Sequence, residues 1–410
     1  MPIDHCRLCK SKRLERFLDL GSTPPSDAFL TKDQLAEPEE SFPLDAYLCL
    51  ECGQVQLGYV VPPDVLYRRN YPYESSTTRT GREHFHGMAA SLAEYFKLTP
   101  ESLVIDIGSN VGVLLEGFKK KGVRVLGVDP ATDMAKIANE NGIETVPEFF
   151  TEAVAKRIVA KYGPAALIVG TNVFAHIDNV DNAVSGMKAL IGSDGAIVIE
   201  APHFLNLVRN LEYDTIYHEH LSYLSIKPLQ QFFRRFDLEL FNVEEHAIHG
   251  GTIRFFVGPK GKYPQSPSVQ AVIAAETTAG IHSIERLKRF AEEVAEQRRS
   301  LRALLEELTS QGKTVVGVSA PAKGNTLLNY CGITTELLPY ITEKARIKVG
   351  LYTPGTRIPI ASDEQLLKDK PDYALILAWN FSEEIMANLA EHRARGGKFI
   401  IPIPEPAITP

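Results

Sequence analysis

The sequence has little that would suit a nucleic-acid-binding, exported or membrane-bound protein. Its 410 residues carry a formal net charge of −7, so the chain offers no positive field to grip a phosphate backbone, and we expect no nucleic-acid partner. The first residues lack the basic and then apolar run of a secretion signal. No apolar run reaches about 18 residues, the length that spans a bilayer. We therefore expect a cytoplasmic protein with no membrane partner.

Cysteine is scarce as well. The five cysteines come without an export signal, which disfavours disulfides and favours reduced thiols that hold a metal. Four of them form the pairs Cys6/Cys9 and Cys49/Cys52, and four thiolates in this arrangement can surround one tetrahedral zinc ion. Two unrelated pairs of free thiols are the alternative. We expect the fifth, Cys331, to be a small buried apolar side chain.

The length exceeds what one hydrophobic core usually supports, and the pattern predicts three domains. Residues 1–75 are spotted with proline and poor in long periodic segments; metal–thiolate bonds, worth about 10–16 kcal/mol for structural zinc, would replace the missing core. Residues 76–262 alternate short apolar strands with helices, and residues 263–410 form a smaller α/β domain. The segment 258–268 is the expected linker between the last two, and a long helix over 269–311, broken near Gly280, is expected to follow it.

The middle segment predicts a doubly wound, Rossmann-like α/β sheet. Its last two strand-like runs, 238–246 and 252–257, have no helix between them and predict an antiparallel pair at the sheet edge. A parallel sheet that ends in such a hairpin is the class I S-adenosylmethionine methyltransferase variant. In the C-terminal segment we expect strands at 314–318, 347–350, 373–377 and 398–402.

The turn after the first buried strand predicts a cofactor site. That strand ends at Asp106 and leads through Gly108, Asn110 and Gly112 into a helix; the glycines let the backbone pass close beneath a ligand. The next strand ends at Asp129, whose carboxylate can accept both ribose hydroxyl hydrogens. The spacing is not G-x-G-x-x-G, so we expect S-adenosylmethionine and not NAD. The alternative is that both aspartates only cap neighbouring helices.

The densest polar cluster, residues 213–223, follows a later strand and should hang over the cofactor, because ligands of open α/β sheets lie outside the carboxyl ends of the strands. A histidine there can move protons near neutral pH, Glu219 can hold its tautomer, and Tyr217 can donate to an oxyanion. The pattern does not decide between His218 and His220. Metal binding by this pair is disfavoured because it offers too few ligands, and a surface loop is the other alternative.

Taken in order, the motifs resemble the sugar C-methyltransferases of deoxysugar biosynthesis, which act at C-3 of nucleotide-linked 4-keto-6-deoxyhexoses. The resemblance covers essentially the whole chain. Besides the cysteine pairs, it rests on Asp-Ile-Gly-Ser-Asn-Val-Gly from Asp106, Gly-Val-Asp-Pro-Ala from Gly127, Asn-Val-Phe-Ala-His from Asn172, Tyr-His-Glu-His from Tyr217, His-Gly-Gly-Thr-Ile-Arg from His249, Ala-Pro-Ala-Lys-Gly from Ala320 and Ala-Trp-Asn from Ala378.

Carried over residue by residue, the resemblance implies zinc at the four paired cysteines and His220 as the catalytic base. It places Tyr217, Glu219 and a tyrosine of the segment Tyr71 to Tyr73 around the sugar. The zinc would be structural, because four thiolates leave no open coordination position.

The resemblance also implies contacts to a nucleotide-sugar substrate, with dTDP as the expected nucleotide. Asn172 and His176 would line the sugar pocket, and Arg254, which ends one of the shared motifs, would also contact the substrate. Lys323 lies in a glycine turn after a strand, which suits a diphosphate, although a domain-packing loop is the alternative there. No dimer seam is visible, so we expect a monomer.

The implied reaction is C-methylation through an enolate, in a pathway of antibiotic deoxysugars. The 4-keto group acidifies the C-3 hydrogen, a base removes it, and hydrogen-bond donors stabilise the charge on oxygen. The carbanion then attacks the methyl of S-adenosylmethionine, held about 3 to 3.5 Å away. The alternatives are an O- or N-methyltransferase on another small metabolite or sugar nucleotide, and a zinc-ribbon interaction protein with a relict methyltransferase fold.

Overall fold

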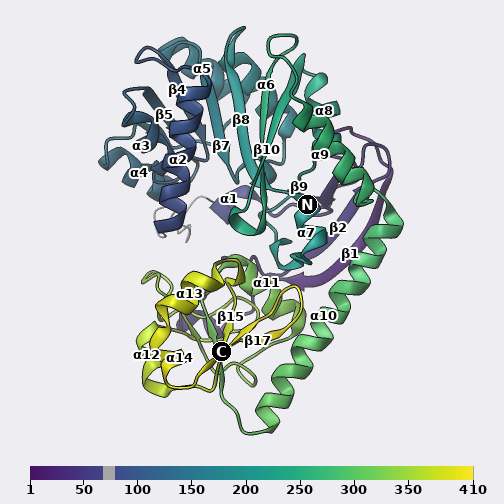
Figure 1. Ribbon diagram of the computed structural model, residues 1–410, viewed down its shortest axis with the longest axis vertical. Helices are drawn as coiled ribbons and strands as arrows, with labels where there is room; N and C mark the ends of the chain where they lie inside the picture. Colours follow the sequence, from purple (N-terminus) through teal and green to yellow (C-terminus); the bar gives the residue numbers. More distant parts are fainter. Residues whose placement is uncertain (68–78, 410) are drawn as a thin grey trace.

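The structure is a computed structural model that describes residues 1–67 and 79–409, and it contains sheets of four, seven and six strands (Figure 1). The seven-stranded sheet and the C-terminal sheet lie at opposite ends of the molecule, and the long helix α10 (Ile284–Ser310) runs along one side between them. None of the described helices is long and apolar enough to cross a membrane.

The seven-stranded sheet has the predicted class I methyltransferase topology. Its order is β10-β11-β8-β7-β4-β5-β6, and β11 runs antiparallel to both β8 and β10 while the other described pairs are parallel. The predicted edge hairpin is therefore confirmed. The strands are β4 (Leu103–Ile107), β5 (Arg124–Val128), β6 (Thr145–Val146), β7 (Leu167–Thr171), β8 (Ala196–Pro202), β10 (Leu238–His246) and β11 (Thr252–Pro259).

Both faces of this sheet are covered, which explains why its strands read as apolar runs. Successive side chains point to opposite faces: Val104 packs with the helices α2, α3 and α4, whereas Ile105 packs with α5, α6, α8 and α9. The helices on the two faces are α2 (Arg79–Tyr95), α3 (Val113–Lys119), α4 (Thr132–Glu140), α5 (Glu152–Tyr162), α6 (Val180–Ile191), α8 (Ile226–Arg234) and α9 (Pro267–Thr278).

The N-terminal segment contains longer strands than its sequence indicates. Its four-stranded sheet has the order β1 (Leu14–Thr23), β2 (Phe42–Cys49), β3 (Val55–Leu57) and β9 (Ser222–Tyr223). Alternate residues of β2 are buried together with Leu287 and Phe290 of α10. The core of this sheet is thus completed by a helix more than 200 residues away, which no local pattern could indicate.

The break near Gly280 is confirmed, because α9 ends at Thr278, α10 begins at Ile284 and Gly280 has a φ of +69°. Val269 of α9 packs into the core of the seven-stranded sheet. The division at residue 262 stays a prediction, and we propose that the packing unit of the middle domain extends through α9.

The C-terminal sheet has the order β14-β13-β12-β15-β16-β17. The predicted strand at 347–350 is wrong: these residues form a turn, and the side chains of Ile347 and Val349 are exposed. The strands are β12 (Val315–Val318), β13 (Ile341–Thr342), β14 (Ile360–Ala361), β15 (Tyr373–Ile376), β16 (Lys398–Ile401) and β17 (Ala407–Thr409). The remaining α-helices are α1 (Pro63–Tyr67), α7 (Phe204–Arg209), α11 (Ala322–Cys331), α12 (Asp363–Asp369), α13 (Ser382–Asn388) and α14 (Ala390–Ala394).

The four paired cysteines form a cluster whose geometry fits zinc. All four sulfur atoms lie within 4.8 Å of one another, with Cys6 and Cys52 at 3.6 Å and Cys9 and Cys49 at 3.5 Å. Four sulfurs at ~2.3 Å from a tetrahedral zinc are about 3.8 Å apart, whereas a disulfide brings two sulfurs to ~2.05 Å. The donor set therefore suits a closed structural site.

The cysteine cluster is tied to the polar segment 213–223. Arg7, inside the first cysteine pair, donates from Nη1 to the carbonyl oxygens of Leu57 at 2.9 Å and of Leu221 at 3.1 Å. Strand β3 begins at Val55, and Val55 pairs with Tyr223 of β9. Two connections thus run from the zinc module to the residues that directly follow His220.

We expect Cys9→Ser to remove a zinc ligand and to lower both the bound zinc per chain and the unfolding temperature, because structural zinc contributes folding free energy directly. Metal analysis by atomic absorption and thermal unfolding measure the two effects. Cys331→Ser is the matched control, since Cys331 is buried but lies outside the cluster. Full zinc content in Cys9→Ser would contradict the assignment.

Candidate active site

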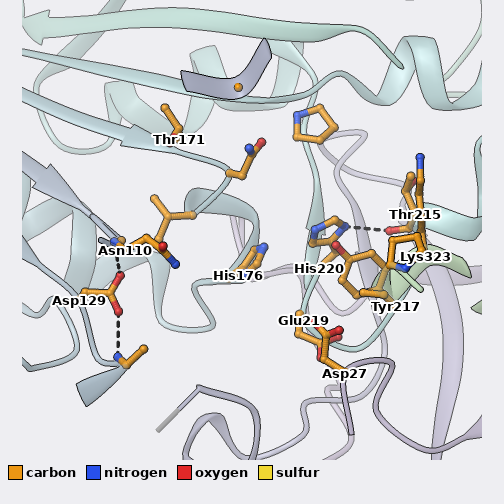
Figure 2. A pocket seen from close by; sticks show the side chains of 18 of the residues that line it. Asp27, Asn110, Asp129, Thr171, His176, Thr215, Tyr217, Glu219, His220 and Lys323 are labelled. Atoms are coloured by element: carbon orange, nitrogen blue, oxygen red, sulfur yellow. Dashed lines mark hydrogen bonds between the residues drawn. The ribbon is translucent and has the colours of Figure 1, made fainter. Parts of the chain in front are cut away.

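A cavity of about 910 Å³ lies between the three segments of the chain (Figure 2). Its wall includes the turn after β4, the end of β5, the segment around His220 and the start of α11. The carboxyl ends of the parallel strands open into it, as expected for an open α/β sheet.

The turn after β4 can be built only with glycine at two positions. Gly108 has a φ of +73° and Gly112 a φ of +84°, and a Cβ atom at these positions would lie 2.7 Å from Val173 and 2.9 Å from Ile143, respectively. Side chains here would meet both backbone strain and a steric clash. The turn can therefore bring its backbone directly against a ligand in the cavity.

Asp129 fixes this turn and still has capacity for a ligand. Its Oδ2 accepts the backbone N–H of Asn110 at 2.7 Å, and its Oδ1 accepts that of Ala131 at 2.8 Å (Figure 2). Each carboxylate oxygen has a second acceptor site, which suits a ribose hydroxyl. The capping alternative is thus partly correct, because Asp129 braces the backbone as well as facing the cavity.

Asp106 gives the clearest sign of a missing polar partner. Its side chain is buried, and its Oδ1 has no hydrogen-bond partner among the described residues. Burial and the charge of Asp129 hold the pKa of Asp106 well above its usual range. An unsatisfied buried oxygen in a cavity wall points to a polar ligand group, so the residues present fit a cofactor such as S-adenosylmethionine.

The structure separates the two histidines that the sequence could not. His220 lines the cavity, whereas His218 is fully buried, and its Nε2 donates to the carbonyl oxygen of Phe42 at 3.2 Å. The imidazole of His220 donates from Nδ1 to the carbonyl oxygen of Thr215 at 2.8 Å (Figure 2). A carbonyl can only accept, so Nδ1 carries the proton and Nε2 is left as the basic nitrogen.

The surroundings of His220 keep it neutral. Burial lowers the pKa of His220 to about 4. The ring packs against Tyr217 with centroids 4.0 Å apart and lies 5.0 Å from the ring of His176. His176 is itself held neutral, since burial keeps its pKa well below the usual range.

Glu219 does not hold the tautomer of His220; the carbonyl of Thr215 does. Glu219 lies instead beside Asp27 from the N-terminal segment (Figure 2), and burial together with the charge of Asp27 raises the pKa of Glu219 to about 8. Asp27 is a site residue that the sequence did not indicate. It sits in a proline-rich turn that is anchored on α11, where Asn325 donates to the carbonyl oxygen of Ser26 at 2.6 Å, and nothing local marks it.

Lys323, Asn172 and His176 all line the cavity. Lys323 lies in the first turn of α11; its ammonium lies 3.9 Å from the ring centroid of Trp379 and donates to the side chain of Asn380. Burial lowers the pKa of Lys323 to about 8, against the charges of Asp214 and Glu212, which raise it.

Arg254 is not among the residues that line the cavity. Its Nη2 donates to Glu200 at 2.7 Å and its Nη1 to Glu244 at 3.2 Å, and Glu200 also binds His84 at 2.6 Å. Arg254 thus takes part in an ion-pair network that joins β8, β10, β11 and α2, and its contact with the substrate stays a prediction. The predicted Tyr71 and Tyr73 lie outside the described residues.

Comparison with known proteins agrees with this geometry. Three family profiles match consecutive parts of the chain: a zinc-binding domain over residues 6–67, a methyltransferase domain over 81–243 and a C-methyltransferase C-terminal domain over 247–404. The chain is 37% identical to the C-methyltransferase NovU of Streptomyces niveus over 408 residues, which covers 99% of this chain and 97% of NovU. The chain belongs to this C-methyltransferase family.

These matches confirm the family resemblance of the motifs. They also confirm the predicted enzyme class and the cofactors of this C-methyltransferase, S-adenosylmethionine and structural zinc. The chain is also 25% identical to the ubiquinone biosynthesis O-methyltransferase of Burkholderia pseudomallei (strain 1710b) over 168 residues, 38% of this chain and 72% of that protein.

Solved structures similar to the C-methyltransferase include an S-adenosylmethionine-dependent methyltransferase from Clostridium acetobutylicum, with a TM-score of 0.36, 11% identity and coverage of 44% of this chain and 92% of that one. Another is magnesium protoporphyrin IX methyltransferase from Synechocystis with bound SAH, with a TM-score of 0.36, 13% identity and coverage of 46% and 90%.

We expect Asp129→Ala to weaken S-adenosylmethionine binding by about 10- to 100-fold, because a hydrogen bond to a charged group contributes about 1.5–3 kcal/mol. Isothermal titration calorimetry measures the Kd. Asp133→Ala, at an exposed position in the first turn of α4, is the matched control. Unchanged affinity in Asp129→Ala would contradict the cofactor assignment.

We expect the imidazole of His220 to stay neutral as the pH falls through 6.5, the usual histidine value, and to take up a proton only near pH 4. Between these values the unfolded chain binds a proton that the folded site does not, so this site loses stability as the pH falls. NMR titration of labelled histidine, assigned with His220→Asn, tests this; a midpoint near 6.5 would contradict the buried geometry.

Proposed function

We propose that this C-methyltransferase transfers a methyl group to C-3 of a nucleotide-linked 4-keto-6-deoxyhexose, with dTDP as the nucleotide. One observation carries the proposal: the basic nitrogen of a neutral, oriented histidine faces the same cavity as the cofactor turn. Membership of a C-methyltransferase family makes carbon the acceptor, so the O- or N-methyltransferase alternative is disfavoured.

The proton moves first. Nε2 of His220 accepts the proton from C-3, which the neighbouring ketone acidifies, and the carbonyl of Thr215 stabilises the Nδ1–H of the imidazolium that forms. Tyr217, whose ring packs against the imidazole, would donate to the developing oxyanion at C-4. The bound cofactor supplies an electrophilic methyl group on a sulfonium.

The remaining contacts are part of the same proposal. Asn172 and His176 follow β7 and line the cavity. His176 lies between the cofactor turn and His220 (Figure 2). Lys323, Lys344 and Lys348 line its C-terminal wall, where cations suit a diphosphate. A nucleotide-sugar substrate and a monomeric enzyme complete the proposal.

We expect His220→Asn to lower solvent deuterium exchange at C-3 of a dTDP-4-ketohexose, measured by NMR or mass spectrometry without a methyl donor, by about 10²- to 10⁴-fold, the usual contribution of a general base. S-Adenosylmethionine binding should persist, because His220 does not touch the cofactor turn. His218→Asn is the comparison variant: it lies outside the cavity lining and should retain exchange.

Exchange at full rate in His220→Asn would remove this histidine from the role of base. Exchange at C-5, the other carbon beside the ketone, would keep the enolate chemistry but contradict the proposed position. A panel of nucleotide-linked 4-ketohexoses with labelled methyl donor then identifies the sugar and the nucleotide.

A further inference from the structure

The turn before the base is bound on several sides by the C-terminal part of the chain. This turn, η3 (Tyr213–Thr215), packs against α11. The hydroxyl of Tyr213 donates to Oε1 of Gln297 on α10 at 2.6 Å, and Nε2 of Gln297 donates to the carbonyl oxygen of Pro402 at 2.7 Å. Segments distant in sequence therefore hold one short turn in place.

Asp214 binds this turn to the C-terminal segment through a hydrogen bond. Its side chain is fully buried, and its Oδ2 accepts the indole N–H of Trp379 at 2.7 Å. The ammonium of Lys323 supplies the opposing positive charge, and the carboxyl of Glu212 adds a like charge nearby. A buried carboxylate is costly unless it is hydrogen-bonded and paired. Backbone groups of Asp214 and Thr215 also hydrogen-bond this carboxyl. The two side chains that act on it, Trp379 through a hydrogen bond and Lys323 through its charge, come from the C-terminal segment.

Thr215, the residue after Asp214, orients the imidazole of His220. The carbonyl oxygen of Thr215 accepts the Nδ1–H of His220 at 2.8 Å, and the hydroxyl of Thr215 donates to the carbonyl oxygen of Glu212 at 2.7 Å. Because η3 is a single tight turn, a displacement of Asp214 displaces the carbonyl of Thr215 with it. The direction of Nε2 at His220 therefore depends on where Asp214 is held.

We propose that Asp214 is a positioning residue which, through its bond to Trp379, aligns the imidazole of His220 from the C-terminal domain. The inference rests on the proposed role of His220 as base, and it assigns the C-terminal domain a part in proton abstraction in addition to substrate contacts. Asp214 acts through the Thr215 carbonyl and touches neither the base nor the cofactor turn.

The test compares three variants. Trp379→Phe removes the indole N–H but keeps an aromatic ring near Lys323. Asp214→Ala removes the acceptor. Asp214→Asn keeps an oxygen for the indole N–H while it loses the charge that faces Lys323, so it should recover much of the wild-type behaviour. Tyr373→Phe, on β15 of the same C-terminal sheet, is the control.

The primary readout is the Nδ1–H signal of His220 in ¹⁵N-histidine-labelled protein, assigned with His220→Asn. We expect this signal to weaken or broaden in Trp379→Phe and Asp214→Ala and to persist in Asp214→Asn and Tyr373→Phe. Deuterium exchange should fall about 10- to 100-fold in the first two, as small misplacements of reacting groups do, with the Kd for S-adenosylmethionine changed less than about twofold. Trp379 is the one tryptophan of the chain, so its fluorescence emission should change in Asp214→Ala.

The proposal is overturned if Trp379→Phe and Asp214→Ala keep the wild-type imidazole signal and exchange rate, or if they lower only the unfolding temperature. If either variant fails to fold, Asp214→Asn with an intact indole contact decides the question. An imidazole signal and an exchange rate that match those of Tyr373→Phe support alignment of His220 through the Asp214–Trp379 hydrogen bond. Loss of the signal and of exchange while that contact is intact overturns the proposal. Failure of the proposed function gives a different result. In that case His220→Asn would keep full exchange, while the imidazole signal of His220 in the Asp214 and Trp379 variants would still show whether these residues align it.

Discussion

The polar segment 213–223 is held at both ends by parts of the chain that are remote in sequence, and the rest of the site depends on this constraint. At its start, Asp214 accepts the indole N–H of Trp379. At its end, Tyr223 pairs with Val55 of the N-terminal sheet. His220 lies between these two anchors in the chain and lines the same cavity as the cofactor turn of the middle sheet. The imidazole is therefore positioned by all three segments.

This arrangement explains how the zinc module can contribute to the site although it lies far from the reacting atoms. The module has few residues with which to form a core, and it obtains part of one from α10. The cysteine cluster fixes the knuckle that carries Arg7, and Arg7 donates to the carbonyl of Leu221, next to His220. The zinc ion would stabilise the position of the base without taking part in the chemistry.

Burial in the cavity wall shifts the pKa values of His220 and Glu219 from those of free side chains. Burial keeps His220 neutral at neutral pH, which leaves Nε2 available to accept a proton. Burial and Asp27 keep a proton on Glu219 into the same range. A neutral imidazole can accept a proton, and a protonated carboxyl can donate a hydrogen bond.

The sequence predicted those elements whose conformation is set by residues close together in the chain. The turn from Asp106 to Gly112 and the hairpin after β8 follow from glycine positions and from apolar periodicity, and both appear in the structure as expected. The roles of His218 and His220 could not be separated, because carbonyl groups of Phe42 and Thr215 make the difference. Asp27, Trp379 and the ion pairs of Arg254 depend on contacts between distant segments, and β13 and β14 are two-residue strands with no pattern of their own.

A crystal structure of the protein with S-adenosylhomocysteine and a dTDP-linked ketosugar would show directly whether His220 faces the reacting carbon. We expect the sugar to lie between the cofactor sulfur and His220, with Nε2 directed at the carbon next to the ketone. A sugar bound elsewhere in the cavity, or an imidazole turned away from it with the Thr215 contact broken, would contradict the account.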